Sequence, residues 1–423
     1  MKSMPIDLRK TAAFSWSQTE FKLSFQPESD EVLILKYYLL ENANYLSDKV
    51  EIRSCSGADP KSRLQLLGGE KGEMKALHFL GEKKIELIDL PTPEIRSDEV
   101  LIEVQAAGLC GSDLHLFYTP SRAEKEAGIF GLKFPPDNIP GHEPCGKIVE
   151  VGSNVKHLKI GDRVAVAHIS GCGNCSICRK GWDMHCAQKR TYGGDIQGAF
   201  AEFMPARAKD CVLLPENISY LDGAFYTCGA STGYYSLKRA NLLGGETILC
   251  VGLGPVGLAG AYFASMLGAR VIGVDLLQER CDHSLNFGVE VAINASTENV
   301  QERIKEITKG EGCNVAIDYT GAPAGRITAI EAAGLWGRVV LIGFGKGYTN
   351  IETELHIIEK QLTVVGAWVF SFPELQDLVA FSSNRGIDLS NFTSTQSTIG
   401  DGSKLFADFD KGSTGKTFIT RQG

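Results

Sequence analysis

The sequence predicts an α/β protein that contains a doubly wound parallel sheet. Two observations lead to this fold class: a glycine-rich turn follows an apolar run and precedes a helix-compatible run, and strand-like and helix-like segments alternate after it. A third observation concerns the part of the chain before that turn, where two groups of cysteine and histidine residues have the types that bind metal ions.

The glycine-rich turn lies in "ETILCVGLGPVG", residues 246–257. Gly252, Gly254 and Gly257 form the pattern G-x-G-x-x-G, with Val256 inside it. Such glycines permit a tight turn, close approach of the backbone to a pyrophosphate, and close packing of helix on strand. The free N–H groups at the start of the following helix favour an anion. We therefore expect a dinucleotide to bind at this turn.

Asp275 ends the next predicted strand, "RVIGVD". A carboxylate at about this distance from the glycines accepts hydrogen bonds from ribose hydroxyls and repels a 2′-phosphate. The sequence therefore predicts NAD in preference to NADP. Arg280 lies a little further along and is a second candidate contact to the ribose.

The alternation of strands and helices continues to about residue 368. We expect strands at 291–295, 313–321, 338–344 and 361–368, a helix at 299–307 and another that ends at Leu335. With the two strands around the glycine-rich turn, this makes six β-units, which is typical of a doubly wound sheet.

Four cysteines occur close together in "GCGNCSICRKGWDMHC", residues 171–186. Their spacing, C-x2-C-x2-C-x7-C, lets tight turns aim four thiolates at one tetrahedral ion, which predicts a structural zinc site. Two disulfides and a redox-active C-x-x-C pair are the alternatives. The ligands are Cys172, Cys175, Cys178 and Cys186. A zinc ion with four protein ligands has no open position, so chemistry is expected elsewhere.

A second group of residues is spread along the chain. Cys110 stands in "GLCGSDLH", His142 in "IPGHEPCGKIVEVG" and Cys228 in "YTCGASTGY". Two thiolates and one imidazole would leave a fourth zinc position free for water or a substrate oxygen.

Polar residues beside these candidate ligands suggest supporting roles. Ser112 and His115 could pass a proton from a bound alcohol to solvent. Asp113 could orient a metal-bound histidine. Glu143 could do the same or approach the ion directly; for both carboxylates a loop position with no role is the alternative.

With these motifs in place, the chain from about Met74 to its end resembles the zinc-dependent medium-chain alcohol dehydrogenases, in the branch of the threonine and polyol dehydrogenases. "GLCGSDLH", "PGHEPCGKIVEVG", "KIGDRVAV", the four-cysteine segment, "GLGPVG" and "STGKTFI" occur in the family's order. A Cys2His catalytic zinc is the ligand set known for alcohol dehydrogenase, so this assignment rests on the resemblance.

The resemblance implies a GroES-like, β-rich catalytic domain interrupted by a Rossmann domain. It places the catalytic domain at 74–225 and 366–423, the structural zinc lobe at 171–187 and the NAD-binding domain at 226–365. Residues 1–73 form an N-terminal extension of unknown role. The resemblance also implies two zinc ions per subunit, NAD as the cofactor, Thr232 near the nicotinamide, and a homodimer or homotetramer.

The sequence departs from the polyol and threonine dehydrogenases at two points. It has Cys228 where these enzymes commonly carry a glutamate nearby, and the stretch 366–375 lacks an arginine that polyol dehydrogenases tend to have. We therefore expect a less polar substrate pocket, lined by Tyr118, Trp368 and Phe370.

Composition excludes several other classes of protein. The net charge of -8 argues against binding to nucleic acid. No apolar run is long enough to span a bilayer; the longest, at 32–40, contains a lysine. Cysteines in metal-ligand patterns rather than in pairs predict a reducing, cytoplasmic location, with organelle targeting by the N-terminal extension left open.

The sequence thus predicts an NAD-dependent zinc enzyme that oxidises a secondary alcohol, such as a polyol or amino alcohol, to a ketone. The alternatives are a zinc alcohol dehydrogenase acting on simple alcohols or aldehydes, a zinc-free reductase of the same superfamily, and an inactive protein that only binds or senses nucleotides.

Overall fold

The computed structural model describes residues 12–17, 20–25, 72–119, 138–412 and 414–421. The chain divides into two compact units, residues 1–71 and 72–423. In the first unit, β1 (Ala12–Ser17) and β2 (Glu20–Phe25) pair antiparallel. The apolar run at 32–40 and any targeting segment lie outside the described residues.

The second unit begins with a β-rich part. Its seven-stranded sheet has the order β11-β7-β6-β5-β19-β18, and β10 also pairs with β5. The same part of the chain also forms two separate two-stranded sheets, β3 with β4 and β8 with β9. The strands of this part are β3 (Glu73–Gly81), β4 (Lys84–Pro91), β5 (Glu99–Gly108), β6 (Pro144–Val151), β7 (Arg163–Val166), β8 (Ile169–Ser170), β9 (Arg190–Thr191), β10 (Phe203–Arg207), β11 (Cys211–Leu213), β18 (Thr393–Thr398) and β19 (Lys416–Thr420).

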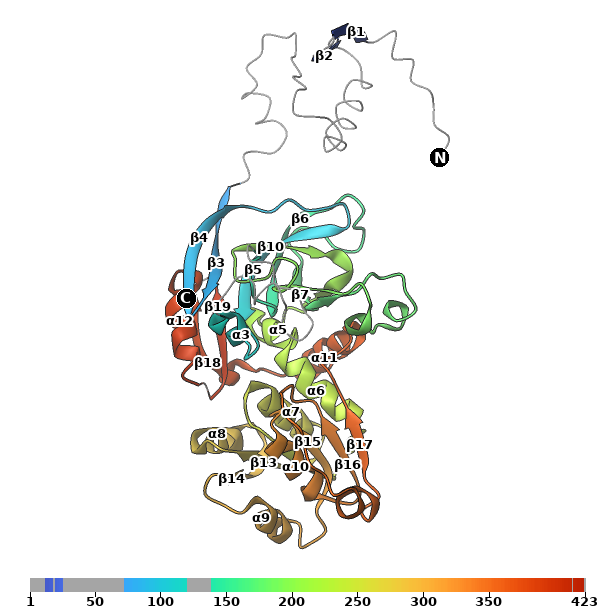
Figure 1. Cartoon of the computed structure of the whole chain (residues 1–423), viewed down its shortest axis with the longest axis vertical. Helices are drawn as coiled ribbons and strands as arrows, with labels where there is room; N and C mark the ends of the chain where they lie inside the picture. Colours follow the sequence, from blue (N-terminus) through green and yellow to red (C-terminus); the bar gives the residue numbers. More distant parts are fainter. Residues whose placement is uncertain (1–11, 18–19, 26–71, 120–137, 413, 422–423) are drawn as a thin grey trace. The chain divides into compact units, whose positions relative to one another are not determined.

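The end of the chain completes this sheet. Strand β19 pairs antiparallel with β5 and parallel with β18, although some 300 residues separate β5 from β19 in the sequence. Figure 1 shows these late strands, in red, beside the blue and cyan strands of residues 73–108. The β-rich part is therefore built from two distant segments of the chain.

The segment between these two parts forms a six-stranded, wholly parallel sheet of order β14-β13-β12-β15-β16-β17. Its strands are β12 (Thr247–Val251), β13 (Arg270–Asp275), β14 (Val289–Asn294), β15 (Cys313–Asp318), β16 (Ala333–Leu341) and β17 (Thr363–Gly366). The strand order reverses at β12, which is the arrangement of a doubly wound sheet. The predicted fold class is confirmed.

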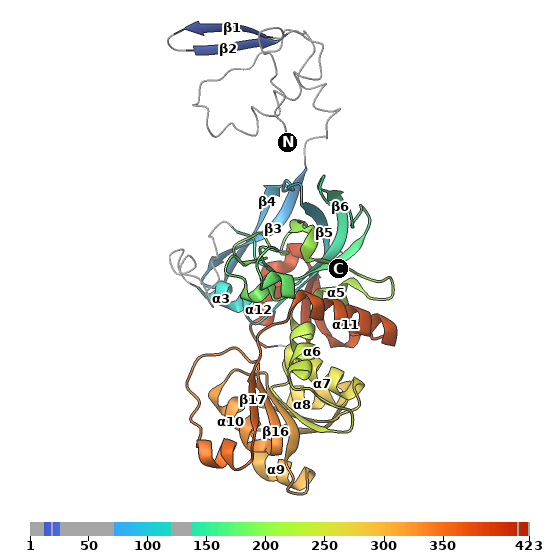
Figure 2. The ribbon, with the colours of Figure 1, turned by 90° about the vertical axis from the view of Figure 1, so that its right-hand side faces the viewer.

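Helices cover both faces of the parallel sheet. Alternate residues of β12 divide between two cores: Ile248 and Cys250 pack in one cluster, Leu249 and Val251 in another. Figure 2 shows α10 on one side of the sheet and α7 and α8 on the other. The helices of the second unit are α3 (Asp113–Tyr118), α5 (Tyr220–Tyr226), α6 (Gly229–Arg239), α7 (Pro255–Met266), α8 (Gln278–Ser284), α9 (Val300–Ile307), α10 (Pro323–Ala332), α11 (Phe372–Arg385) and α12 (Gly402–Phe409).

The boundaries predicted around residue 333 are wrong. Helix α10 ends at Ala332 rather than at Leu335, and β16 begins at Ala333, which pairs with Cys313, rather than at residue 338. The ends of the other predicted strands differ from the observed ones by at most three residues. The physical reason lies at Gly334, where a Cβ would come within 2.1 Å of the Glu311 carbonyl oxygen, so the backbone packs closer there than a helix would permit.

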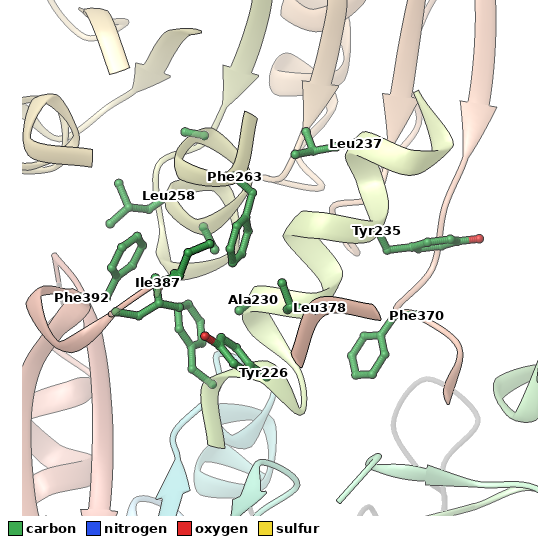
Figure 3. Packing of buried hydrophobic residues seen from close by; sticks show 14 of the residues in the cluster. Tyr226, Ala230, Tyr235, Leu237, Leu258, Phe263, Phe370, Leu378, Ile387 and Phe392 are labelled. Carbon is green, nitrogen blue, oxygen red and sulfur yellow. The ribbon is translucent and has the colours of Figure 1, made fainter. Parts of the chain in front are cut away.

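A large apolar cluster joins the two parts of the second unit. Figure 3 shows Tyr226, Ala230, Leu258, Phe263 and Phe392 within it, contributed by α5, α6, α7 and the segment after α11. These residues are buried from solvent, so the β-rich part and the parallel sheet share one core.

No helix among the described residues is long and apolar enough to cross a membrane.

Candidate active site

One cavity of about 780 Å³ brings the two groups of predicted site residues together. Its walls come from the start of α3, the loop before β6, the start of α6, the glycine-rich turn before α7 and the end of β13. Its volume is that of a small-molecule or cofactor site. Predicted site residues in its lining are Cys110, Ser112, Asp113, His115, His142, Cys228, Thr232, Gly252, Gly254, Val256, Gly257, Asp275, Arg280 and Trp368.

Four potential metal ligands converge at this cavity. Cys110, His142, Glu143 and Cys228 each offer one ligand atom, and these atoms all lie within 4.8 Å of one another. Cys110 precedes α3, His142 and Glu143 precede β6, and Cys228 is the residue before α6. Residues 118 positions apart in the sequence are therefore brought to one point by the fold.

Asp113 fixes two of these ligands. Its Oδ1 lies 3.1 Å from His142 Nδ1, and its Oδ2 accepts a hydrogen bond of 2.8 Å from the Cys110 backbone N–H. The carboxylate is almost completely buried. Because Nδ1 donates to Asp113, His142 presents Nε2 to the cluster, as a metal-bound histidine with a carboxylate partner does.

The electrostatics favour a thiolate at Cys110. A hydrogen bond from the Cys228 thiol lowers the pKa of Cys110 well below its usual value, and the same bond raises the pKa of Cys228. Burial lowers the pKa of His142, but Asp113 and Cys110 together raise it well above its usual value. Binding of a metal ion to these groups would release protons from them.

Glu143 lies on the inner side of the cluster and does not line the cavity. Its Oε1 accepts a hydrogen bond of 2.6 Å from Lys416 Nζ, whereas its Oε2 is buried without a hydrogen-bond partner. Burial raises the pKa of this carboxyl to about 7, against the opposing effect of Lys416. Gly108 makes room for it, because a Cβ there would come within 2.2 Å of Oε2.

Lys416 was not predicted as a site residue. It is buried in β19 and also donates to the Leu109 carbonyl oxygen at 2.8 Å. The only signal in the sequence is its place in "STGKTFI".

His168 is a second site residue that the sequence did not reveal. It lines the cavity, and its ring centroid lies 5.7 Å from that of His142. Its Nδ1 lies 2.7 Å from the Thr227 carbonyl oxygen, and burial lowers its pKa to about 4. The ring is therefore neutral at physiological pH, with Nδ1 as a hydrogen-bond donor and Nε2 as a hydrogen-bond acceptor.

Ser112 is the residue before the short helix α3, and His115 lies within this helix. Both residues line the cavity. Ser112 Oγ lies 3.4 Å from His142 Nε2, within the ligand cluster, while His115 is exposed to solvent. The predicted proton path needs a hydroxyl beside the ligand cluster and an imidazole in contact with solvent, and Ser112 and His115 have these positions.

The glycine-rich turn has the close packing that its pattern predicts. A Cβ at Gly257 would lie 1.8 Å from the Gly252 carbonyl oxygen, whereas a Cβ at Gly254 would meet only Arg280 Nη1, at 3.8 Å. Gly254 is the residue before α7 and faces the cavity. The turn thus leaves the helix N-terminus open toward the cavity, where a pyrophosphate fits.

These two glycines give a matched pair of substitutions. We expect Gly257→Ala to lower the free energy of unfolding by about 1–3 kcal/mol, because the added methyl meets fixed backbone. Gly254→Ala has room in the fold but extends into the space for the pyrophosphate, so it should keep its stability and lose nucleotide affinity. Urea unfolding and nucleotide titration of both variants check this; equal stability of the two would contradict it.

Asp275 lies at the end of β13 with both carboxylate oxygens in use. Oδ2 accepts from the Leu253 N–H at 2.8 Å and Oδ1 from the Leu277 N–H at 3.0 Å. Arg280 Nη1 is 3.7 Å from Oδ2. A carboxylate has about four acceptor positions, so both oxygens retain capacity for ribose hydroxyls.

Thr232 and Val256 face the same cavity from α6 and α7. The Thr232 hydroxyl donates to the Cys228 carbonyl oxygen at 2.7 Å, so its methyl group is the part left to pack against a ligand.

The four cysteines of the second cluster also converge. Their ligand atoms lie within 4.8 Å of one another, with Sγ–Sγ distances of 3.5 Å for Cys175–Cys178 and 3.9 Å for Cys172–Cys178 and Cys175–Cys186. Four sulfurs at 2.3 Å around a tetrahedral zinc would be about 3.8 Å apart. Hydrogen bonds from the backbone N–H groups of Asn174 and Cys175 lower the pKa of Cys172 to about 6.

The predicted pocket residues divide. Trp368 lines the cavity, but Tyr118 and Phe370 do not. Tyr118 ends α3, is half exposed, and donates a hydrogen bond to Asp410. Phe370 is buried in the shared core (Figure 3). Its ring packs against that of His168, with 5.3 Å between ring centroids.

The residues present fit the groups that the fold implies. The four-cysteine cluster has the spacing of a tetrahedral thiolate site, and the Cys110 cluster holds an unpartnered buried carboxylate oxygen beside two sulfurs and an imidazole. The turn at Gly252 provides a backbone cradle that side chains would fill. Two zinc ions and a dinucleotide are therefore compatible with this chain.

Comparison with known protein families gives two matches. A model described as "Alcohol dehydrogenase GroES-like domain" matches residues 96–216, and one described as "Zinc-binding dehydrogenase" matches residues 255–384. The first covers the Cys110 and four-cysteine clusters, and the second begins within the glycine-rich turn.

Known proteins of similar sequence and structure agree with these matches. An uncharacterised zinc-type alcohol dehydrogenase-like protein of Escherichia coli is 40% identical over 308 residues, 70% of this chain and 84% of that protein. A sorbitol dehydrogenase of Bacillus subtilis is 35% identical over 64% of this chain and 75% of its own length. The structure of an alcohol dehydrogenase from Thermus sp. superimposes with a TM-score of 0.74 at 25% identity, covering 82% of this chain and 99% of that one.

Proposed function

Because this chain belongs to the zinc-dependent medium-chain alcohol dehydrogenases, we propose that it oxidises a secondary alcohol with a neighbouring hydroxyl or amino group, a polyol or amino alcohol, to the ketone with NAD. Membership makes the chain a zinc-dependent oxidoreductase with a nicotinamide cofactor. The observation that carries the proposal is that the Cys110, His142 and Cys228 cluster and the glycine-rich turn line one cavity.

In this proposal Cys110, His142 and Cys228 would hold the catalytic zinc, and Glu143 would be an additional ligand that exchanges with water. The four-cysteine cluster holds a second, structural zinc. When bound, the zinc polarises the substrate oxygen as a Lewis acid and the nicotinamide accepts hydride from the carbinol carbon.

The chain's own residues move the proton. Ser112 Oγ is next to the ligand cluster, 3.4 Å from His142 Nε2, and accepts the proton of the substrate hydroxyl. It passes this proton to His115, which lines the same cavity and is exposed to solvent. Thr232 packs against the nicotinamide.

His168 supports a substrate with a second polar group. Its Nε2 is a hydrogen-bond acceptor in the cavity near the ligand cluster, so it fits a hydroxyl or ammonium donor. Thr191 lines the same cavity, and its Oγ1 is buried without a hydrogen-bond partner. An apolar alcohol would leave both groups without partners, which costs binding free energy.

NAD rather than NADP is supported by Asp275. Its carboxylate is held at the end of β13 by two backbone N–H groups and faces the cavity. A 2′-phosphate beside it would be repelled. We also propose the division into a catalytic domain, 74–225 with 366–423, and an NAD-binding domain, 226–365, and a homodimer or homotetramer, which light scattering tests.

The test is NAD reduction by purified zinc-loaded protein with a panel of polyols, amino alcohols and simple secondary alcohols. We expect the highest kcat/KM for vicinal diols or amino alcohols. In His168→Phe, kcat/KM for these substrates should fall by about a hundredfold, because the second polar group loses its acceptor. Simple secondary alcohols serve as the control and should change by less than about threefold.

Two outcomes would contradict the proposal in different ways. If the wild-type protein prefers simple alcohols and His168→Phe affects all substrates equally, the alternative of a simple alcohol dehydrogenase holds. If NADP supports faster turnover than NAD, the role given to Asp275 is wrong.

A further inference from the structure

The cavity wall includes a short connection between the two parts of the second unit. Residues 367–371 link β17, which ends at Gly366, to α11, which begins at Phe372. Trp368 and Val369 in this connection line the cavity, and Phe370 turns away into the core. Whatever fixes the Trp368 ring therefore fixes part of the cavity's shape.

The backbone of this connection is strained at its centre. Val369 has φ of +47°, a left-handed conformation that a β-branched residue rarely adopts. Such a conformation persists only where the surroundings determine it. Both ends of the connection are anchored: Gly366 pairs with Leu341, and Ser371 and Glu374 form a capping box at the start of α11.

Residues 171–189, the four-cysteine lobe with the two residues that follow it, contact the middle of the connection. The His185 ring contacts Trp368 in a tilted arrangement, with 5.9 Å between centroids and an interplanar angle of 51°. The Lys189 ammonium lies 5.5 Å from the centroid of the same indole ring, within range of a cation–π interaction. At Gly181, a Cβ would come within 2.6 Å of Pro373 at the start of α11, so the lobe also packs against the far end of the connection.

The lobe is a rigid support for these contacts. His185 and Lys189 flank Cys186, whose Sγ accepts hydrogen bonds from the backbone N–H groups of Cys172 and Gln188. Asp183 Oδ1 accepts from the Gly171 N–H at 2.8 Å and from Lys209 Nζ at 3.2 Å. Both residues that contact Trp368 are therefore attached to the folded cysteine knuckle.

We propose that the four-cysteine lobe has a role in substrate selection: His185 and Lys189 are positioning residues that hold the Trp368 ring as a wall of the substrate cavity. This inference rests on the proposed function, since it concerns the same cavity. It gives the lobe a task beyond stability. Substrates that extend toward Trp368 depend on this wall, and small substrates do not.

The test compares His185→Ala, Lys189→Ala and Trp368→Ala on a series of secondary alcohols of increasing length. We expect the ratio of kcat/KM for long over short substrates to change by about threefold to tenfold in each variant. In His185→Ala and Lys189→Ala the change should appear mainly in KM, with kcat for the shortest alcohol within about twofold of wild type. Each lobe substitution combined with Trp368→Ala should add no further change in the ratio.

A readout independent of turnover follows Trp368 itself. The difference in fluorescence between each protein and its Trp368→Phe counterpart isolates this indole. In His185→Ala and Lys189→Ala this difference should show more quenching by acrylamide than in the wild type, because the ring is held less firmly. Arg179→Ala is the matched control: Arg179 is an exposed lobe residue that does not take part in the His185 and Lys189 contacts to Trp368, and its replacement should change neither readout.

Additive effects of the lobe and Trp368 substitutions, or unchanged quenching of Trp368, would overturn the inference. The proposed function fails separately, if wild-type protein reduces NAD with no member of the series. The fluorescence measurement still decides the positioning role in that case.

Discussion

Replacement of Cys110 by serine is expected to lower kcat/KM by at least about a thousandfold, because in the proposed function it removes a thiolate ligand of the catalytic zinc and with it the Lewis acid. The zinc content should fall from two ions per chain to one, since the four-cysteine cluster lies elsewhere in the fold. NAD affinity should be preserved, because the glycine-rich turn and Asp275 are unchanged. Zinc analysis, nucleotide titration and steady-state kinetics on one preparation measure all three quantities.

Cys145→Ala is the matched control. Cys145 is buried three residues after His142, yet it does not belong to the ligand cluster; it packs at Gly223. Its variant should keep both zinc ions and turnover, with only a modest loss of stability. A Cys110→Ser protein with two zinc ions and wild-type turnover would contradict the assignment of the catalytic site.

Lys416→Met is expected to lower the free energy of unfolding by about 3–5 kcal/mol at pH 8, because it leaves the buried Glu143 carboxylate without its cation. The pair is almost fully enclosed, with side-chain exposures of 3% for Lys416 and 0% for Glu143 and a distance of 2.6 Å between Nζ and Oε1. The Glu143→Gln, Lys416→Met double variant should recover part of the loss, since no charge is then left unpaired. Urea unfolding of proteins freed of zinc by a chelator measures it, because a bound zinc ion would itself be a cation beside Glu143.

The loss should be smaller at pH 6 than at pH 8. Burial raises the pKa of Glu143 to about 7 from its ordinary value of 4.5, so the folded state binds more protons than the unfolded state between these values. The stability that this group contributes is fully present below pH 4.5 and is lost as the pH rises through 7. Lys416 lowers this pKa, so in Lys416→Met the carboxyl stays protonated, and its contribution to stability is kept, up to a higher pH than in the wild type.

An exposed ion pair provides the comparison. Lys411 Nζ lies 2.8 Å from Asp408 Oδ1, with side-chain exposures of 75% and 51%. Lys411→Met should change the stability by less than about 0.5 kcal/mol. If Lys416→Met and Lys411→Met change the stability equally at both pH values, Lys416 does not stabilise the fold by compensating the buried charge of Glu143.

The sequence predicted the parallel sheet well because the signals there are local. The strand at 247–251 is apolar on both faces, the glycines at 252, 254 and 257 have steric reasons visible in the pattern, and Asp275 follows at a fixed distance. The end of α10 was missed because its cause, the contact of Gly334 with the Glu311 carbonyl, is between residues brought together only by the fold.

Site residues could be predicted where they belong to a recognisable motif, but not where only the packing of distant segments brings them to the site. Cys110, His142 and Cys228 were found through their motifs, and the fold brings them together. His168 and Lys416 gave no comparable signal, because one owes its role to a carbonyl at Thr227 and the other to a carboxylate 273 positions away.

The pocket aromatics show the same limit. Tyr118, Trp368 and Phe370 were expected to share one wall, but the left-handed turn at Val369 sends Trp368 to the cavity and Phe370 to the core. A β-branched residue rarely adopts a left-handed backbone conformation, so the sequence around Val369 does not predict this turn.

In the proposed function, a zinc ion bound by Cys110, His142 and Cys228 is the place where the alcohol is oxidised. X-ray diffraction from crystals of protein that reduces NAD, recorded on both sides of the zinc absorption edge, locates the zinc ions. We expect two anomalous peaks per chain, one among the four cysteines and one within bonding distance of Cys110 Sγ, His142 Nε2 and Cys228 Sγ. Active protein with a peak only in the four-cysteine lobe would contradict it.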